Sequence, residues 1–122
     1  MKFHLIQSDN KNLITGYDLN WVEVNQERHH SSLIVTPNQL LLEWPVKSIK
    51  DIKKNSFEAI ESLNVEIILL GTGNLQEHLE PRLLEYFSRK NMTVESMNNQ
   101  SACRTYNILA NEERKVILAL ML

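Results

Sequence analysis

The fold is decided by the stretch Asn99-Gln-Ser-Ala-Cys-Arg-Thr-Tyr-Asn-Ile-Leu-Ala110. Read as a helix at about 100° per residue, this stretch gathers its small, aromatic and apolar side chains on one stripe: Ala102, Cys103, Tyr106, Leu109 and Ala110. Arg104, Asn107 and Asn111 fall on a polar stripe roughly opposite. A helix this short needs a large partner surface, and the apolar runs 65–70 and 116–122 supply one. The stretch therefore predicts a helix packed against a β-sheet.

The segments on either side of this helix predict an α/β fold. In the first third, alternating apolar residues predict strands at about 3–6, 19–24, 32–36 and 40–44, with a turn at 25–28, as an antiparallel meander. The later pattern predicts two short helical turns, or one broken helix, over 49–63, a buried strand over 65–70, a helix from Pro81, and strands over 92–97 and 116–122. Strands followed by alternating helices and strands are typical of an α/β sheet with an added antiparallel element.

The length and the amino-acid composition predict one soluble domain over residues 1–122. Hydrophobic residues make up 43% of the chain and charged residues 23%, which is ordinary for a globular protein. The net charge of −2 argues against nonspecific nucleic-acid binding, which needs a strongly basic surface. A single cysteine, Cys103, allows no internal disulfide. The sequence shows neither a signal-like segment nor a membrane-length apolar run, so we expect a cytoplasmic location without membrane insertion.

The Gly71-Thr72-Gly73 loop is the first candidate site. It follows a buried strand and precedes a helix, and backbone amides at such a turn can cradle a phosphate or another anion. Glu95 lies at the distance of a ribose-binding acid, but Gln76 stands where a dinucleotide fingerprint has its third glycine. Pro81 also starts the helix too late for its amides to meet the same ligand. The pattern favours a tight turn and leaves anion binding as the alternative.

Arg104, Thr105 and Asn107 form the second candidate set. If the apolar stripe of their helix faces the sheet, these three face outward or into a groove. An arginine in that place can bind a carboxylate or phosphate through two parallel hydrogen bonds. The alternative is an internal ion pair with an acid elsewhere in the chain: Glu95, Glu112 or Glu113.

Other reactive residue types give weaker indications. Cys103, near a helix start and beside Arg104, could have a lowered thiol pKa, but its place on the apolar stripe favours a buried, inert cysteine. His29 and His30 are adjacent, so on a strand they point to opposite faces and cannot easily bind one metal ion. The sequence contains no Ser/His/Asp spacing, P-loop lysine, CxxC pair or HExxH motif, and we expect no catalytic residue, metal or cofactor.

A set of residues along nearly the whole chain resembles a known family. The matching positions are Tyr17, Trp44-Pro45, Gly71-Thr72-Gly73, Pro81, Glu95-x-Met97 and Ala102-Cys103-Arg104-Thr105-Tyr106-Asn107-x-Leu109. With them the chain is similar to a bacterial-type member of the family of small α/β proteins related to the mitochondrial NADH dehydrogenase (complex I) assembly factor 3. The family tends to have Asp-Thr where this chain has Asn98-Asn99, so no negative charge stands there.

The resemblance implies a three-layer α/β fold around a mixed five-stranded sheet, with a small additional N-terminal antiparallel β element. It implies that the last strand runs antiparallel to its neighbours. It also implies that no enzyme activity is established for the family. For the mitochondrial relatives it implies a role in assembling membrane respiratory complexes through contacts with other proteins.

Together these indications favour a noncatalytic, protein-binding or assembly-factor-like protein with a protein partner. The candidate binding residues lie on the glycine loop and the central helix: Gly71, Thr72, Gly73, Arg104, Thr105 and Asn107. The alternative is a small-molecule or anion-binding domain, or an unrecognised enzyme, that uses the groove between the 71–73 loop and the helix 101–110. A redox role of Cys103 is a third possibility.

Overall fold

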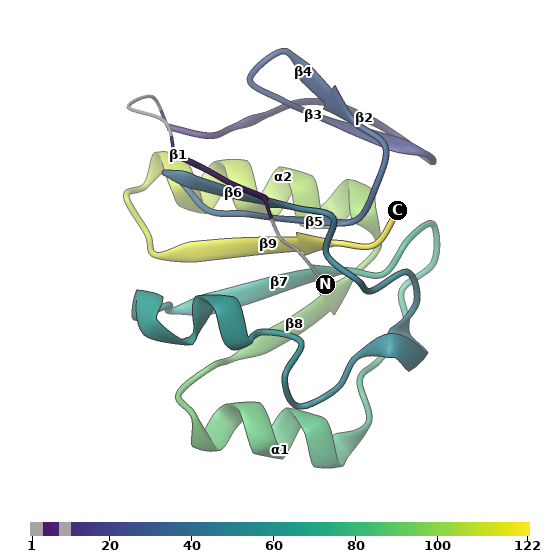
Figure 1. The fold of residues 1–122 in the computed structure, drawn as a ribbon, viewed down its shortest axis with the longest axis vertical. Helices are drawn as coiled ribbons and strands as arrows, with labels where there is room; N and C mark the ends of the chain where they lie inside the picture. Colours follow the sequence, from purple (N-terminus) through teal and green to yellow (C-terminus); the bar gives the residue numbers. More distant parts are fainter. Residues whose placement is uncertain (1–3, 8–10) are drawn as a thin grey trace.

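The computed structural model describes the backbone of residues 4–7 and all of residues 11–122. Its largest element is a six-stranded mixed sheet, to which β1 adds an edge strand beside the five expected. The order across the sheet is β1 (His4–Gln7), β6 (Gln39–Leu42), β5 (Leu33–Val35), β9 (Val116–Leu120), β7 (Ile67–Gly71) and β8 (Val94–Met97). Figure 1 places this sheet between α1 at the bottom and a second, smaller sheet at the top.

The direction of β9 differs from the expectation. It runs antiparallel to β5, where Ile34 pairs with Ala119, but parallel to β7, where Ile68 pairs with Ile117. The expected antiparallel arrangement to both neighbours is therefore wrong on the β7 side. The reason is the two helical crossovers: α1 joins β7 to β8 and α2 joins β8 to β9, and each returns the chain to the same end of the sheet, so that β7, β8 and β9 all run parallel.

Both faces of the main sheet are covered, which confirms the three-layer α/β fold. One face packs on α1 (Pro81–Arg89) and the two short 3₁₀ helices η1 (Ile49–Asp51) and η2 (Glu58–Leu63). The other face packs on α2 (Asn99–Asn111) and on the smaller sheet. Alternating residues of β7 and β9 belong to the two separate cores, as a strand buried on both faces requires.

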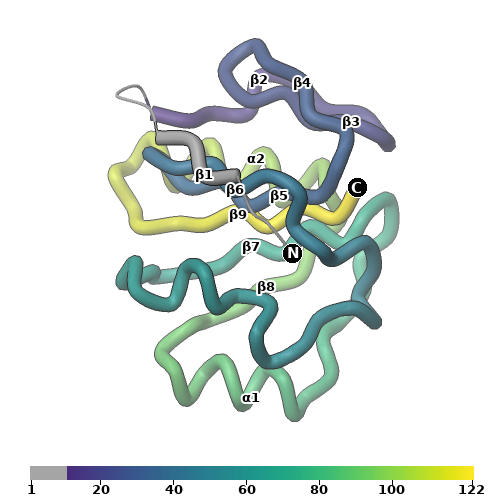
Figure 2. Tube along the Cα trace, viewed as in Figure 1, coloured from purple at the N-terminus to yellow at the C-terminus, as the bar shows by residue number. Residues whose placement is uncertain are grey.

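The smaller sheet is an antiparallel meander of β2 (Ile14–Asp18), β3 (Trp21–Val24) and β4 (Glu27–His29). Its boundaries correct two expectations. The strand expected over 19–24 begins at Trp21, because Leu19 belongs to the turn after β2, and the turn expected over 25–28 overlaps β4. Figure 2 shows the chain leaving this sheet for β5 and β6, which join the main sheet rather than the meander.

The α1 side is held by three aromatic rings. Phe57 is fully buried, stacks on Trp44 at a centroid distance of 5.7 Å, and meets the edge of Phe87 at 5.0 Å. The indole nitrogen of Trp44 donates to the carbonyl of Ser56 at 2.9 Å. The region over 49–63 forms two short helices, as the sequence predicts, and these aromatic contacts seat them on the sheet.

On the other face, α2 begins at the predicted cap region. Asn98 is the N-cap and accepts a hydrogen bond from the backbone nitrogen of Ser101 at 2.8 Å. Ala102, Cys103, Tyr106 and Ala110 are buried against the sheet, and Leu109 is partly buried, which confirms the predicted apolar stripe. The polar stripe of α2 is thereby turned toward β2 and the protein surface.

Candidate functional site

The glycine loop closes onto the first turn of α2. Gly73 accepts a hydrogen bond from the backbone nitrogen of Asn99 at 2.8 Å, and its own nitrogen donates to Asn99 Oδ1 at 3.0 Å. Asn99 Nδ2 donates to the carbonyl of Met121 at 2.9 Å. The Asn99 side chain therefore ties the end of β7, the start of α2 and the chain after β9 together.

Thr72 is an internal residue of the same loop. Its side chain is buried, and its backbone nitrogen donates to the carbonyl of Met97 at 2.9 Å. Its hydroxyl lies 2.7 Å from the carbonyl of Leu75 and accepts from the nitrogen of Glu77 at 3.0 Å. Because the amides of Thr72 and Gly73 already have acceptors, neither is free to cradle an anion in this arrangement.

On α2, Asn107 and Arg104 have different roles. Asn107 Oδ1 accepts from the nitrogen of Ile14 at 2.8 Å, and Asn107 Nδ2 donates to the carbonyl of the same residue at 2.8 Å. This pair of bonds attaches β2 to α2. Arg104 is exposed and forms neither an ion pair nor a hydrogen bond with any of residues 11–122, so the internal ion pair considered from the sequence is not formed. Thr105 is half-buried beside it.

The attachment of β2 to α2 gives a stability prediction. Replacing Asn107 by alanine removes both bonds to Ile14. The backbone N–H and carbonyl of Ile14 then lose their partners at a partly exposed position. We expect the free energy of unfolding to fall by about 1–2 kcal/mol. Urea denaturation followed by circular dichroism measures this change. The matched control is Asn111→Ala, at the exposed end of the same helix, for which we expect a change of less than about 0.5 kcal/mol; equal effects of the two variants would contradict the structural role of Asn107.

A small cavity lies between the glycine loop, the start of α2 and the end of β2 with the turn that follows it. Its volume is about 200 Å³, and three segments line it: Tyr17, Asp18 and Leu19; Gly73 and Asn74; and Asn98, Asn99 and Gln100. Sequence reasoning did not include Tyr17 or Leu19 in the site, because their alternation with polar residues indicated an ordinary half-buried strand. Of the six predicted site residues, only Gly73 lines this cavity.

Exposed apolar side chains surround the cavity and continue along α2. Tyr17 is 38% exposed, Leu19 64% and Ile108 58%. Gln100, Arg104 and Ile108 follow one another at intervals of four residues on α2, so they lie in one row on its surface. We call the surface made by Tyr17, Leu19, Gln100, Arg104 and Ile108 the β2–α2 surface. On this surface the Arg104 guanidinium lies in the same row of α2 as Ile108 and has no partner among residues 11–122.

Cys103 lies beneath this surface and not on it. Its side chain is 1% exposed, and burial raises the pKa of the thiol to about 12. At neutral pH the sulfur is therefore protonated and out of reach of solvent, which is the opposite of a reactive cysteine. The redox role considered from the sequence has no support in this geometry.

The histidines and acids do not form a metal centre in the part of the chain that the structure describes. No group of three or more His, Cys, Asp or Glu side chains in that part is placed to hold an ion. His29 lies on β4, where burial lowers its pKa. Among the described residues, no helix combines the length and the apolar character needed to cross a bilayer.

Comparison with known proteins places this fold in a family. A model of the family described as "Protein of unknown function (DUF498/DUF598)" matches residues 14–121. The chain is 36% identical over 83 residues to the NADH dehydrogenase [ubiquinone] 1 alpha subcomplex assembly factor 3 of Xenopus tropicalis, covering 66% of this chain and 45% of that protein. The chain thus spans about half the length of such assembly factors.

Bacterial proteins are similar over a larger share of their length. The 13 kDa major membrane protein of Francisella tularensis is 33% identical over 94 residues, covering 76% of each chain. A crystal structure of a protein from Bordetella parapertussis superposes with a TM-score of 0.85 at 34% identity, covering 93% of this chain and 98% of that chain. The fold described here is therefore shared with that protein over 93% of this chain.

Proposed function

The chain belongs to the DUF498/DUF598 family of proteins of unknown function, and we propose that it is a noncatalytic, protein-binding assembly factor. The curated relatives named as complex I assembly factor 3 support this role. Their shared segment is about half of their own length. The part in common is therefore the folded domain itself, and a binding function has to reside on the surface of that domain.

The observation that carries the proposal is the guanidinium of Arg104 on the β2–α2 surface, which has no partner among residues 11–122. Arginine and tyrosine are the residue types that most often dominate binding energy at protein interfaces, especially where apolar groups surround them. Tyr17, Leu19 and Ile108 provide that apolar surround. A partner that fits this surface carries a carboxylate for Arg104, flanked by apolar side chains. The names of the relatives indicate the class of partner, which is a membrane respiratory complex or one of its assembly intermediates.

Asn107 and the glycine loop support this surface from below. Asn107 fixes β2, which carries Tyr17, against α2, which carries Arg104. Asn99 fixes the loop 71–73 against the start of the same helix. A rigid arrangement lowers the entropy cost of binding, because fewer side chains and segments have to be ordered on contact.

The alternative function, anion or small-molecule binding in the groove beside the glycine loop, has less support. The amides of Thr72 and Gly73 donate to acceptors within the protein, and the cavity at this end measures about 200 Å³. That volume is below the range of about 300–1,000 Å³ that is usual for small-molecule sites.

Replacing Arg104 by alanine tests the proposal. The protein is crosslinked in lysate of its source cells, and captured proteins are identified and quantified by mass spectrometry. We expect subunits of a respiratory complex among them, and a loss of about 2 kcal/mol in binding free energy for the variant, which is roughly thirtyfold in affinity. Because the guanidinium has no partner among residues 11–122, the stability of the variant should stay within about 0.5 kcal/mol of the parent.

The matched control is Arg82→Ala, an exposed arginine on α1 at the opposite face of the main sheet. It should retain the captured subunits. In cells lacking the protein, the amount of assembled NADH dehydrogenase on native gels should fall, and the parent and the Arg82 variant should restore it, whereas the Arg104 variant should not. Restoration by all three, or unfolding of the Arg104 variant, would contradict the assigned surface.

A further inference from the structure

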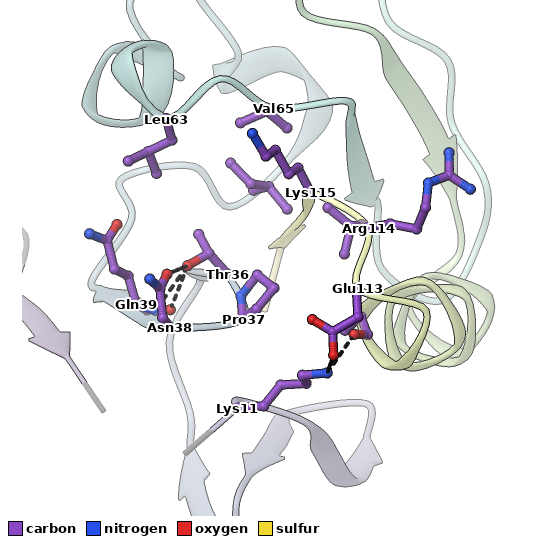
Figure 3. Close-up of a pocket in the computed structure, with 13 residues that line it drawn as sticks. Lys11, Thr36, Pro37, Asn38, Gln39, Leu63, Val65, Glu113, Arg114 and Lys115 are labelled. Atoms are coloured by element: carbon purple, nitrogen blue, oxygen red, sulfur yellow. Dashed lines mark hydrogen bonds and ion pairs between the residues drawn. The ribbon is translucent and has the colours of Figure 1, made fainter. Parts of the chain in front are cut away.

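A second cavity lies at the end of the sheet opposite to the glycine loop, where β9 begins (Figure 3). Its volume is about 480 Å³, which is within the usual range of about 300–1,000 Å³ for small-molecule sites. Four segments that are distant in the sequence meet around it: the chain before β2, the turn between β5 and β6, the chain after η2, and the connection between α2 and β9. We call it the β9 cavity. It lies outside the β2–α2 surface.

The described residues that line the β9 cavity combine an apolar wall with a cationic rim. Leu63 and Val65 are half-buried and lie on one side, with Pro37 on the other, as Figure 3 shows. The rim carries three cationic side chains and one carboxylate: Lys11, Arg114, Lys115 and Glu113. A cavity with this lining favours a ligand that has an apolar body and a negative charge at one end.

Two of the three cations are engaged within the protein. Lys11 Nζ donates to the carbonyl of Ala110 at 2.9 Å and lies 3.4 Å from Glu113 Oε1. Arg114 Nε lies 2.9 Å from Glu66 Oε2. These contacts neutralise two of the positive charges at the rim and leave one.

Lys115 carries the remaining charge. Its backbone nitrogen bonds to Glu66 Oε1 at 3.3 Å, but its ammonium has neither an ion pair nor a hydrogen bond with any of residues 11–122. In Figure 3 the side chain extends toward the Val65 side of the cavity. The turn that carries it is fixed, because Glu113 adopts a left-handed conformation with φ of 62° and Arg114 N donates to the carbonyl of Leu109 at 3.0 Å. One ammonium is thus held at the edge of an apolar wall. The hydrogen bond from the Lys115 backbone is the main cause that lowers the pKa of Glu66, and the Lys115 charge helps to lower it, but Glu66 is already bonded to Arg114, and no acid among residues 11–122 lies within ion-pair distance of the Lys115 ammonium.

We propose that the β9 cavity binds an amphipathic carboxylate, with the carboxylate on Lys115 and an aliphatic chain against Leu63, Val65 and Pro37. A single free ammonium matches the single negative charge of a carboxylate. A phosphate group carries more charge and more acceptor oxygens, and the cations that would satisfy them are engaged with Glu113 and Glu66. The ligand class is therefore a fatty acid or a related aliphatic carboxylic acid.

Titration of the protein with decanoate, below its micelle concentration, tests the proposal by calorimetry and by amide chemical shifts. We expect saturable binding of one decanoate per chain, with the largest shifts at 36–39, 63–65 and 113–117. Lys115→Gln should weaken binding about tenfold, the effect of losing one charge-assisted hydrogen bond. Decanol, which has the same chain without the charge, should bind parent and Lys115→Gln equally and weakly.

Two further variants make the test specific. Lys50→Gln removes an exposed lysine of η1 outside the β9 cavity and should leave decanoate binding unchanged. Val65→Glu places a carboxylate on the apolar wall and should abolish binding through like-charge repulsion. The proposal is overturned if the parent shows no saturable binding, if Lys115→Gln binds as well as the parent, if the shifts map elsewhere, or if inorganic phosphate binds more tightly than decanoate. Arg104→Ala should bind decanoate normally, so failure of this proposal is distinct from failure of the proposed function.

Discussion

Replacing Tyr106 by alanine is expected to lower the free energy of unfolding by about 3–5 kcal/mol, as for other large aromatic residues removed from a core. Tyr106 is fully buried, with an exposed fraction of 0%. It packs in the core between α2, the main sheet and the smaller sheet. Because folded domains have a total stability of only about 5–15 kcal/mol, this variant should be close to unfolding at physiological temperature.

Tyr106→Phe separates the contribution of the ring to stability from that of the hydroxyl. The hydroxyl donates to the carbonyl of Asn12 at 2.8 Å, and Asn12 in turn donates through Nδ2 to the carbonyls of Thr36 and Gln39, both at 3.0 Å. Phenylalanine keeps the packing and leaves the buried carbonyl of Asn12 without this donor. We expect a loss of about 1–2 kcal/mol. Urea denaturation measures both variants, and a phenylalanine variant as unstable as the alanine variant would show that the ring contributes little.

Gly71→Ala is expected to cost about 3 kcal/mol, because the added methyl group overpacks the junction and displaces a hydrogen-bonded amide. A Cβ at this position would overlap Asn99 Oδ1 and Leu120 Cδ2. Leu120 is fully buried, and the Asn99 amide is held by its bonds to Gly73 and Met121. Asn99 cannot move without breaking its bonds to Gly73 and Met121, and Leu120 is paired with Gly71 in the sheet and packed in the core.

Gly73→Ala is the matched comparison. Gly73 has φ of +95°, but no atom outside its chain neighbours lies within 4 Å of an added Cβ. Its substitution therefore costs only the backbone strain of an L-residue in a left-handed region, about 1–2 kcal/mol. Thermal and urea denaturation should rank Gly71→Ala as the more damaging variant. The reverse order would show that backbone conformation, and not close packing, makes the loop glycine-rich.

The α2 segment shows how far local sequence information reaches. The spacing of Ala102, Cys103, Tyr106 and Ala110 predicted both the helix and its buried face, because helical periodicity depends only on neighbouring residues. The same argument placed Arg104 on the outside, where the structure has it. It could not show that Arg104 lacks a partner among residues 11–122. Several acids lie near it in the sequence, and only their positions in the fold show that none of them forms an ion pair with it.

Asn107 shows the limit of the same argument. Its position on the polar stripe was predicted correctly, but its partner is the backbone of Ile14, which is 93 residues away in the chain. The contribution of Tyr17, at the end of β2, and of Leu19, in the turn after it, to the small cavity was missed for the same reason. Alternation predicts a strand, but it does not say which sheet the strand joins or which of its faces stays exposed.

By itself, the sequence determined the alternation of helices and strands, the buried face of α2 and the glycine loop after β7, since each depends on residue types at short spacing. The tertiary structure decided which strands pair, the direction of β9 relative to β7, and the roles of Asn99 and Asn107 as internal connections. It also brought four distant segments together around the β9 cavity and left the Lys115 ammonium there without a hydrogen bond or ion pair to any of residues 11–122. These features depend on contacts between residues far apart in the chain, and such contacts form only when the layers pack.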